Sequence, residues 1–318
     1  MTLTELATDL AFPEGPAILP DGTLACVEMA AGRVSRIRRD GGRMTLAETG
    51  GGPNGMAVEP DGHLYVCNNG GLRWMRDEAG LRPHGTAPDY SGGRIERINL
   101  ETGRVERLYE RCDGQPLLAP NDLVFGAEGG FYFTDTGRNI LTAREYGRVL
   151  YATTDGSSIR EVAGPMLTPN GVGLSPDGCT LYVVETETAR LWSFSLTDRG
   201  EVAKAPYPSP HGGRCLTGLP VFCRFDSLAL DAAGNICVAT LVTGQVTVIS
   251  PTGQVLEEHT VPDLFCTNLC FGGKDGRTAY VTLSSSGRLV AIPWTRSGLV
   301  LHPHGVGRLR EPDSNCPE

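Results

Sequence analysis

The sequence predicts an all-β chain folded as a six-bladed β-propeller, and two observations support this prediction. Glycine and proline occupy 42 and 22 of the 318 positions, a density of turn-forming residues that argues against a helical bundle. In addition, one sequence pattern recurs six times along the chain. A repeated unit that can form three to four short antiparallel strands is typical of a propeller blade.

Each repeat opens with a short-chain polar or acidic residue, which we call the anchor. The anchors are Glu14, Asn54, Asn121, Asn170, Asp226 and Asn268. A glycine follows every anchor eight residues later, and successive anchors lie 40, 67, 49, 56 and 42 residues apart. A pair of stacked sandwiches would not keep this register through six units, and a solenoid would show a tighter period with parallel strands.

Within a unit, an apolar run after the anchor, a turn at the glycine and a second apolar run predict a β-hairpin. Third strands are expected at 32–37, 93–98, 147–152, 189–194, 244–249 and 287–292, and more polar fourth strands, for example, at 43–48 and 104–109. We expect residues 3–11 to add a strand to the last blade, because that pairing would close the ring and remove a sheet edge.

The remaining segments fit a single propeller domain over residues 1–318. Residues 72–92 and 198–222 are long insertions, which we interpret as loops on the rim of one face. The tail after about residue 303 is interpreted as a loose end.

Composition and charge restrict the classes of function. The chain has 28 basic and 37 acidic residues, a net charge of −9, and no basic run, so nucleic acid is not an expected partner. No stretch approaches 18 uninterrupted apolar residues, and the start, MTLTELATDLAFPEG, lacks the features of a secretory leader. The 10 cysteines are scattered without a C-x-x-C, which favours reduced thiols. We therefore expect a cytoplasmic protein that does not bind membranes; the sequence does not indicate its oligomeric state.

The anchors predict a site for one divalent cation. The first strand of each propeller blade lines the central channel, so the six anchors should converge at one mouth of it. One Glu, one Asp and four Asn offer only oxygen, and two carboxylates in a narrow channel would be costly to bury without a cation. Ca²⁺ is the expected ion, with Mg²⁺, Mn²⁺ and Zn²⁺ as alternatives. A second interpretation, in which Asn54 and Asn268 only form turns, stays open.

The chain resembles the SMP-30/gluconolactonase/luciferin-regenerating-enzyme-like family over residues 9–294. The resemblance lies in the FPEGP around Glu14, in the blocks at 120–135 and 169–183, and in Asp226 at the start of the fifth unit. It implies a metal-dependent lactonase acting on a sugar lactone or a similar small lactone. It also implies that Glu14, Asn170 and Asp226 are metal ligands, and that Asn121 is a ligand or a contact to water and substrate.

Two positions depart from the pattern of that family. The fifth unit reads Asp226-Ser227 where Asp-Gly is usual, and Ala119 stands where some members carry an arginine that grips a sugar lactone. Specificity for sugar lactones is therefore left open.

The implied mechanism is metal-assisted attack of water on the lactone carbonyl. Asp226 is expected to act as the general base or to orient the water. Asn54, Asn121 and Arg138 are candidate substrate contacts, although Arg138 fits a solvated surface charge equally well. Two alternative functions remain, a phosphotriester hydrolase of the same fold and a non-enzymatic calcium-binding propeller that binds a protein partner.

Overall fold

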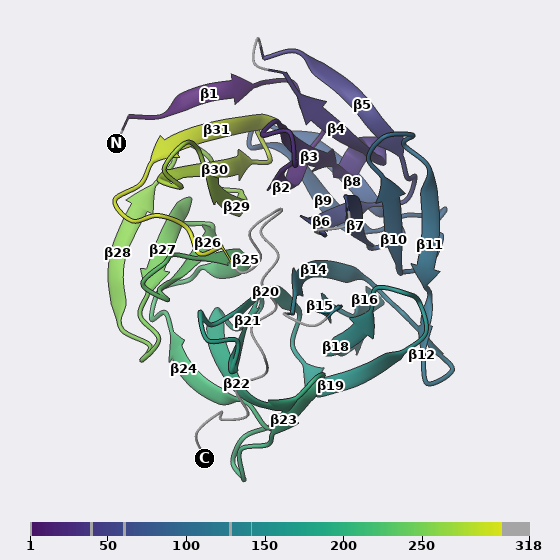
Figure 1. Ribbon diagram of the computed structural model, residues 1–318, viewed down its shortest axis with the longest axis vertical. Coiled ribbons are helices and arrows are strands. Elements are labelled where there is room, and N and C mark those ends of the chain that lie inside the picture. Colours follow the sequence, from purple (N-terminus) through teal and green to yellow (C-terminus); the bar gives the residue numbers. More distant parts are fainter. Residues whose placement is uncertain (1, 39–40, 60–61, 127–128, 141, 301–318) are drawn as a thin grey trace.

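Six small antiparallel sheets surround a central axis in the computed structural model (Figure 1). The structure describes residues 2–38, 41–59, 62–126, 129–140 and 142–300, so the predicted loose tail lies outside the described residues. The described part contains no α-helix, and its one helical element is a 3₁₀ turn at Met29–Ala31. The prediction of a six-bladed β-propeller is confirmed.

Each blade is a sheet of four strands, with a fifth strand in the fourth blade. The first three blades comprise β2 (Pro13–Ile18), β3 (Leu24–Glu28), β4 (Arg33–Ile37) and β5 (Arg43–Glu48); β6 (Pro53–Val58), β7 (His63–Asn68), β10 (Arg94–Asn99) and β11 (Val105–Tyr109); and β14 (Pro120–Phe125), β15 (Gly130–Asp135), β18 (Gly147–Thr153) and β19 (Ile159–Met166).

The last three blades comprise β20 (Pro169–Leu174), β21 (Thr180–Glu185), β22 (Arg190–Asp198), β23 (Glu201–Ala203) and β24 (Arg214–Gly218); β25 (Arg224–Leu230), β26 (Ile236–Leu241), β27 (Gln245–Ile249) and β28 (Val255–Thr260); and β29 (Cys266–Gly272), β30 (Thr278–Leu283), β31 (Arg288–Pro293) and β1 (Thr4–Ala7). All six predicted third strands are therefore present, within a few residues of the expected bounds.

The glycine that recurs eight residues after each anchor has a conformational cause. In all six repeats this glycine lies in the turn between the first two strands of the blade, with φ between 72° and 86°. Other residues adopt this left-handed backbone only at a cost, so the hairpin turn selects glycine each time.

The hydrophobic core lies between neighbouring blades. Between the second and third blades, Tyr65, Phe125, Phe131 and Phe133 form one aromatic cluster, with ring centroids 5.2 to 5.9 Å apart for the contacting pairs. Similar clusters fill the other interfaces, so each blade is stabilised by its two neighbours and the ring must close.

Ring closure involves both ends of the described chain. β1 pairs antiparallel with β31, with Thr4 opposite Ala291 and Ala7 opposite Leu289, and Figure 1 shows the purple strand beside the yellow one. The expectation that an N-terminal strand completes the last blade is confirmed.

The two insertions have different structures. Residues 72–92 contain a hairpin of β8 (Leu72–Asp77) and β9 (Gly80–Thr86), whose tip reaches the sixth blade, where Leu81 N donates to Ser285 O at 3.0 Å. The interpretation of residues 198–222 as a rim loop is wrong for β23 and β24, which both pair with β22 at the outer edge of the fourth blade.

Eight cysteines of the described residues carry free thiols. Cys179 is disulfide-bonded, so the expectation of reduced thiols is wrong at that position. Among the described residues, no helix has the length and apolar character needed to span a membrane.

A chain that begins at residue 8 should test the role of β1 in ring closure. We expect the free energy of unfolding in urea to fall by about 2 kcal/mol, because the cross-strand pairs with β31 and the burial of Ala7 are lost. Self-association in size-exclusion chromatography should rise, because β31 becomes an open edge. The control is Thr8→Ala, which removes a hydroxyl in contact with exposed Asp9. An unchanged urea midpoint in the shortened chain would contradict the prediction.

Candidate functional site

All six anchors lie near the starts of the first strands of their blades, at the second or third residue. These strands are β2, β6, β14, β20, β25 and β29, each in contact with the next around the axis. The pairing of every first strand with its second strand shifts register at or next to the anchor. Such bulges turn a side chain away from the regular alternation, here at the mouth of the channel. We call the face of the propeller on which the first strands begin the anchor face.

Glycines after three of the anchors permit the close approach of neighbouring first strands. A Cβ atom at Gly15 would overlap Asn54 O, and one at Gly171 would overlap the backbone at Ser227 and Leu228. A Cβ atom at Gly55 would overlap the carboxylate of Asp122, which occupies that space instead. The crowding at the axis therefore explains the repeated glycine and places Asp122 inside the ring of anchors.

Three carboxyl groups are buried together at this mouth. Glu14, Asp122 and Asp226 are only 3%, 7% and 8% exposed. Burial raises the pKa of Glu14 to about 7, against hydrogen bonds from Gly15, Asn268 and Thr267. Burial and repulsion from Glu14 raise the pKa of Asp122 to about 8 and hold the pKa of Asp226 well above its usual range. The three groups together favour the binding of positive charge.

Asp122 was missed by the sequence reasoning, which stopped at the anchor before it. A signal was present, because the residue after the anchor is glycine in three repeats and aspartate here. Ser227, the departure in the fifth repeat, also lies in this cluster, with its Oγ 3.5 Å from Asn170 Oδ1.

Two anchor amide oxygens are buried without a partner. Asn121 Oδ1 and Asn54 Oδ1 make no hydrogen bond within the described part of the chain. Asn170 is oriented by its own amide nitrogen, which donates to Thr186 Oγ1 at 3.0 Å. The oxygen of Asn268 is already engaged, because it accepts from Leu269 N at 2.7 Å. The anchors thus differ in their availability to a ligand.

This donor set fits a hard divalent cation. Buried carboxylates and unpartnered amide oxygens are what Ca²⁺ prefers, and an orphaned buried oxygen is costly unless a ligand satisfies it. No group of three or more His, Cys, Asp or Glu side chains among the described residues could hold a metal without other ligands. Any cation site here must therefore include the amide oxygens.

A second set of buried acceptors fixes the chain just before the anchors. Glu28, Asn68, Asp135 and Glu185 end the second strands of the first four blades. They accept backbone N–H bonds from Ala11 at 3.0 Å, Gly52 at 2.9 Å, Leu118 and Ala119 at 2.8 and 2.7 Å, and Leu167 at 2.7 Å. We call these four residues the strand-end acceptors. They were also missed, although each follows its anchor by 14 or 15 residues.

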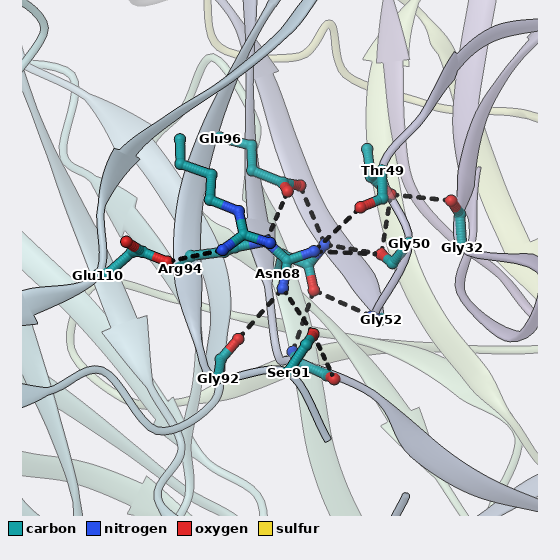
Figure 2. A network of polar contacts seen from close by, with 12 residues as sticks. Gly32, Thr49, Gly50, Gly52, Asn68, Ser91, Gly92, Arg94, Glu96 and Glu110 are labelled. Atoms are coloured by element: carbon teal, nitrogen blue, oxygen red, sulfur yellow. Dashed lines mark hydrogen bonds and ion pairs between the residues drawn. The ribbon is translucent and has the colours of Figure 1, made fainter. Parts of the chain in front are cut away.

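A network of polar contacts around Asn68 fixes the segment that precedes the anchor Asn54 (Figure 2). Arg94, only 1% exposed, donates to Glu96 Oε1 at 2.6 Å and to Thr49 O at 3.0 Å. Asn68 Nδ2 donates to the other oxygen of Glu96 at 3.0 Å and to Gly50 O at 2.9 Å. The segment that leads into Asn54 is therefore fixed by a buried ion pair whose polar atoms are hydrogen-bonded.

Arg138 lies on the rim rather than among the anchors. It belongs to the short hairpin of β16 (Arg138–Ile140) and β17 (Ala143–Glu145), and its Nε donates to Glu145 Oε2 at 2.8 Å. Its guanidinium also stacks on Tyr90, 4.6 Å from the ring centroid. The hydroxyl of Tyr90 donates to Leu118 O at 2.5 Å, which places this pair beside the approach to Asn121. Its role as a substrate contact stays a prediction.

A cavity continues inward from the anchors. It has a volume of about 290 Å³ and is lined by Asp122, Asn268 and side chains such as Leu123, Val172 and Phe271. Of the three carboxyl groups, Asp122 borders this cavity directly.

Comparison with known proteins gives consistent matches. The family model described as the SMP-30/Gluconolactonase/LRE-like region matches residues 12–285. A gluconolactonase of Zymomonas mobilis is 26% identical over 308 residues, covering 88% of this chain and 78% of that protein. Lactonase drp35 of Staphylococcus haemolyticus is 30% identical over 256 residues, covering 76% and 69%. The solved structure of a gluconolactonase from Xanthomonas campestris has the same fold, with a TM-score of 0.71 at 24% identity over 92% of this chain and 89% of that one.

Replacement of a strand-end acceptor should destabilise the protein, because backbone N–H groups lose their hydrogen-bond acceptor. In Asp135→Ala, the N–H groups of Leu118 and Ala119 lose their acceptor, so we expect the free energy of unfolding to fall by about 3 kcal/mol. Asp135→Asn keeps one acceptor oxygen and should lose less. The control is Asp89→Ala on an exposed turn, which should change stability little. Equal stability of Asp135→Ala and the unmodified protein in urea would contradict this assignment.

Proposed function

The chain belongs to the SMP-30/gluconolactonase/LRE-like family, and from this membership and the oxygen-rich channel mouth we propose that it is a lactonase that uses one divalent cation. The observation that supports this most strongly is the burial of Glu14 and Asp226 beside the unpartnered oxygen of Asn121. The gluconolactonase and lactonase relatives identify the cyclic ester as the first substrate class to test.

The residues proposed to hold the cation are Glu14, Asn121, Asn170 and Asp226. Two carboxylates would balance its charge, and two amide oxygens would add neutral ligands, which favours Ca²⁺ over softer ions. When bound, the cation would polarise the lactone carbonyl and stabilise the negative charge that develops on its oxygen.

Asp226 is proposed to act on the attacking water. Its carboxylate would accept a hydrogen bond from the water and take up its proton as the water adds to the carbonyl carbon, and the proton would pass to the ring oxygen as the C–O bond of the lactone breaks. A carboxylate close to a cation is a weak base, so orientation of the water would be a large part of its contribution. Asn170, which hydrogen-bonds Asp226, would keep that carboxylate in position.

The other anchors and the rim are proposed to orient the lactone. Asn121 and Asn54 have buried amide oxygens free to meet a substrate or a bound ion. Arg138, fixed by Glu145 and Tyr90, would contact the polar part of the substrate from the rim. These contacts would place the carbonyl against the water, where correct orientation contributes strongly to the rate.

Metal removal is the first test of this proposal. Chelator-treated protein should lose lactone hydrolysis and regain it with Ca²⁺, Mg²⁺, Mn²⁺ or Zn²⁺, measured in one assay that also includes a phosphotriester. Full lactonase activity in demonstrably metal-free protein would contradict the metal dependence. Hydrolysis of the phosphotriester alone would replace the lactonase by the alternative hydrolase, and binding of metal without either activity would favour a binding protein.

The stoichiometry of metal binding tests the ligand set. Asn54→Ala should leave one ion bound and raise KM at most, whereas Asn121→Ala should weaken binding. Both amide oxygens are buried without a partner, so the two variants are well matched. Loss of the ion in Asn54→Ala would show that the ligand set also includes this residue.

Asp226 and Glu14 should differ when each carboxylate is changed to an amide. Asp226→Asn keeps an oxygen but loses the base, so we expect metal binding to persist, more weakly, and kcat to fall by roughly 10²-fold or more at saturating metal. Glu14→Gln should lose activity mainly because it binds the metal more weakly, and it should recover much of its rate when the metal concentration is raised. Equal recovery of both variants would remove the proton-accepting role from Asp226.

A further inference from the structure

We propose that the lactone taken by this site carries an apolar substituent, an alkyl or aryl group, that lies on a row of exposed apolar side chains beside Asp226. The row consists of Phe222, Val242 and Leu264, which are 78%, 39% and 54% exposed. The inference rests on the proposed lactonase function and adds the class of substrate.

The three residues are neighbours, although they come from three separate loops. Arg224 and Leu241 are opposite one another in the β25–β26 pair, so the chain before Arg224 and the chain after Leu241 leave the sheet side by side. Val242 N in turn donates to Leu264 O at 2.9 Å. The three positions therefore follow one another from the fifth blade to the sixth.

The row lies on the anchor face, on segments that lead toward the proposed catalytic group. Phe222 precedes Asp226 by four residues, and Leu264 precedes Asn268 by four residues. Both segments lead directly into the first strands β25 and β29, whose anchors lie at the channel mouth. A substituent on a lactone held at the anchors would meet this row as it leaves the channel on that side.

Val242 is held outward by a strained backbone. Its φ is +75°, in the left-handed region that a β-branched residue rarely adopts, and its side chain remains exposed. Strain of this kind persists where the surrounding structure imposes it and concentrates at functional sites. Val242 thus keeps an apolar side chain exposed in spite of backbone strain, beside two other exposed apolar residues. This points to a ligand that covers it.

The third and fourth blades carry ion pairs on their part of the rim. On the third and fourth blades, Arg138 pairs with Glu145, and Arg144 lies 3.9 Å from Glu187. Charged side chains and exposed apolar side chains such as Ile140 occur together there, whereas the three residues of the apolar row lie on the fifth and sixth blades. A polyhydroxylated lactone would place hydroxyl groups against the apolar row, whose own side chains offer no hydrogen-bond donor or acceptor, whereas an alkyl or aryl group is favoured there.

A small molecule fits this row better than a protein does. A stable protein interface buries about 800 Å² on each partner. Three partly exposed side chains, the largest of them one phenylalanine, offer well under that area. The strip is, however, the right size for a short alkyl chain or one ring.

The experiment compares kcat/KM for γ-butyrolactone, γ-nonalactone and glucono-δ-lactone with the metal-loaded protein. We expect γ-nonalactone to exceed γ-butyrolactone at least 10-fold, because each buried methylene contributes up to about fourfold. It should also exceed glucono-δ-lactone. Phe222→Ser and Leu264→Ser should each reduce the preference for γ-nonalactone over γ-butyrolactone at least fivefold.

The matched control is Leu256→Ser. Leu256 is 43% exposed on β28, the outer strand of the fifth blade, and should leave the preference unchanged. Because the readout is a ratio measured on one protein sample, partial loss of folded protein does not affect it.

Each result decides the proposal. Hydrolysis of γ-butyrolactone or the sugar lactone with no preference for the alkyl lactone would overturn this inference and leave the lactonase function standing. So would a preference that neither rim variant reduces, or one that the control reduces equally. Absence of activity on all three lactones would overturn the lactonase function and this inference with it.

Discussion

The close approach of six first strands around one axis is the constraint on which the rest of the structure depends. Backbones meet so tightly that a side chain is excluded after three anchors, at Gly15, Gly55 and Gly171. The same crowding brings one side chain from every blade to the channel mouth, so the fold itself concentrates polar groups in a desolvated space. Three carboxyl groups with raised pKa values are the direct result. The chemistry of the site is therefore a consequence of the closed ring rather than of one loop.

The strand-end acceptors satisfy the backbone N–H groups that lead into the anchors, so the anchor side chains are not needed for that purpose. Asp135 satisfies the N–H groups of Leu118 and Ala119, and so Asn121 is not needed to cap its own approach. Its amide oxygen stays unpartnered and can serve a ligand. The buried Arg94–Glu96 pair supports an acceptor in turn, since it fixes Asn68 and the segment before Asn54. In the first four blades, the polar groups that hold the backbone are thus separate from those available to a ligand.

The propeller could be predicted because the pattern that produces a blade, a polar anchor with a glycine eight residues later, occurs six times in the sequence. The left-handed turn requires glycine, and the start of each first strand at the axis carries a polar residue. This repeated pattern predicted the register of the repeats, the number of blades and the positions of the third strands. What escaped prediction depends on neighbours that one repeat does not reveal. Asp122 matters because it fills the space beside Gly55 in another blade, and β23 and β24 formed because β22 had a free edge to pair with. Likewise, only the structure shows Arg138 held between Glu145 and Tyr90.

The hairpin of β8 and β9 bears on the order of events during synthesis. It is made with the second blade, yet its tip bonds to Ser285 in the sixth, and Trp74 packs 4.9 Å from Phe12 over the first. The hydrogen bond between the tip and Ser285 therefore cannot form until nearly the whole chain has left the ribosome. Final placement of this hairpin must coincide with arrival of the last blade, and so must the contact of Asn268 with Glu14. A nascent chain paused before residue 285 would hold most of the sheets but an unfinished anchor face.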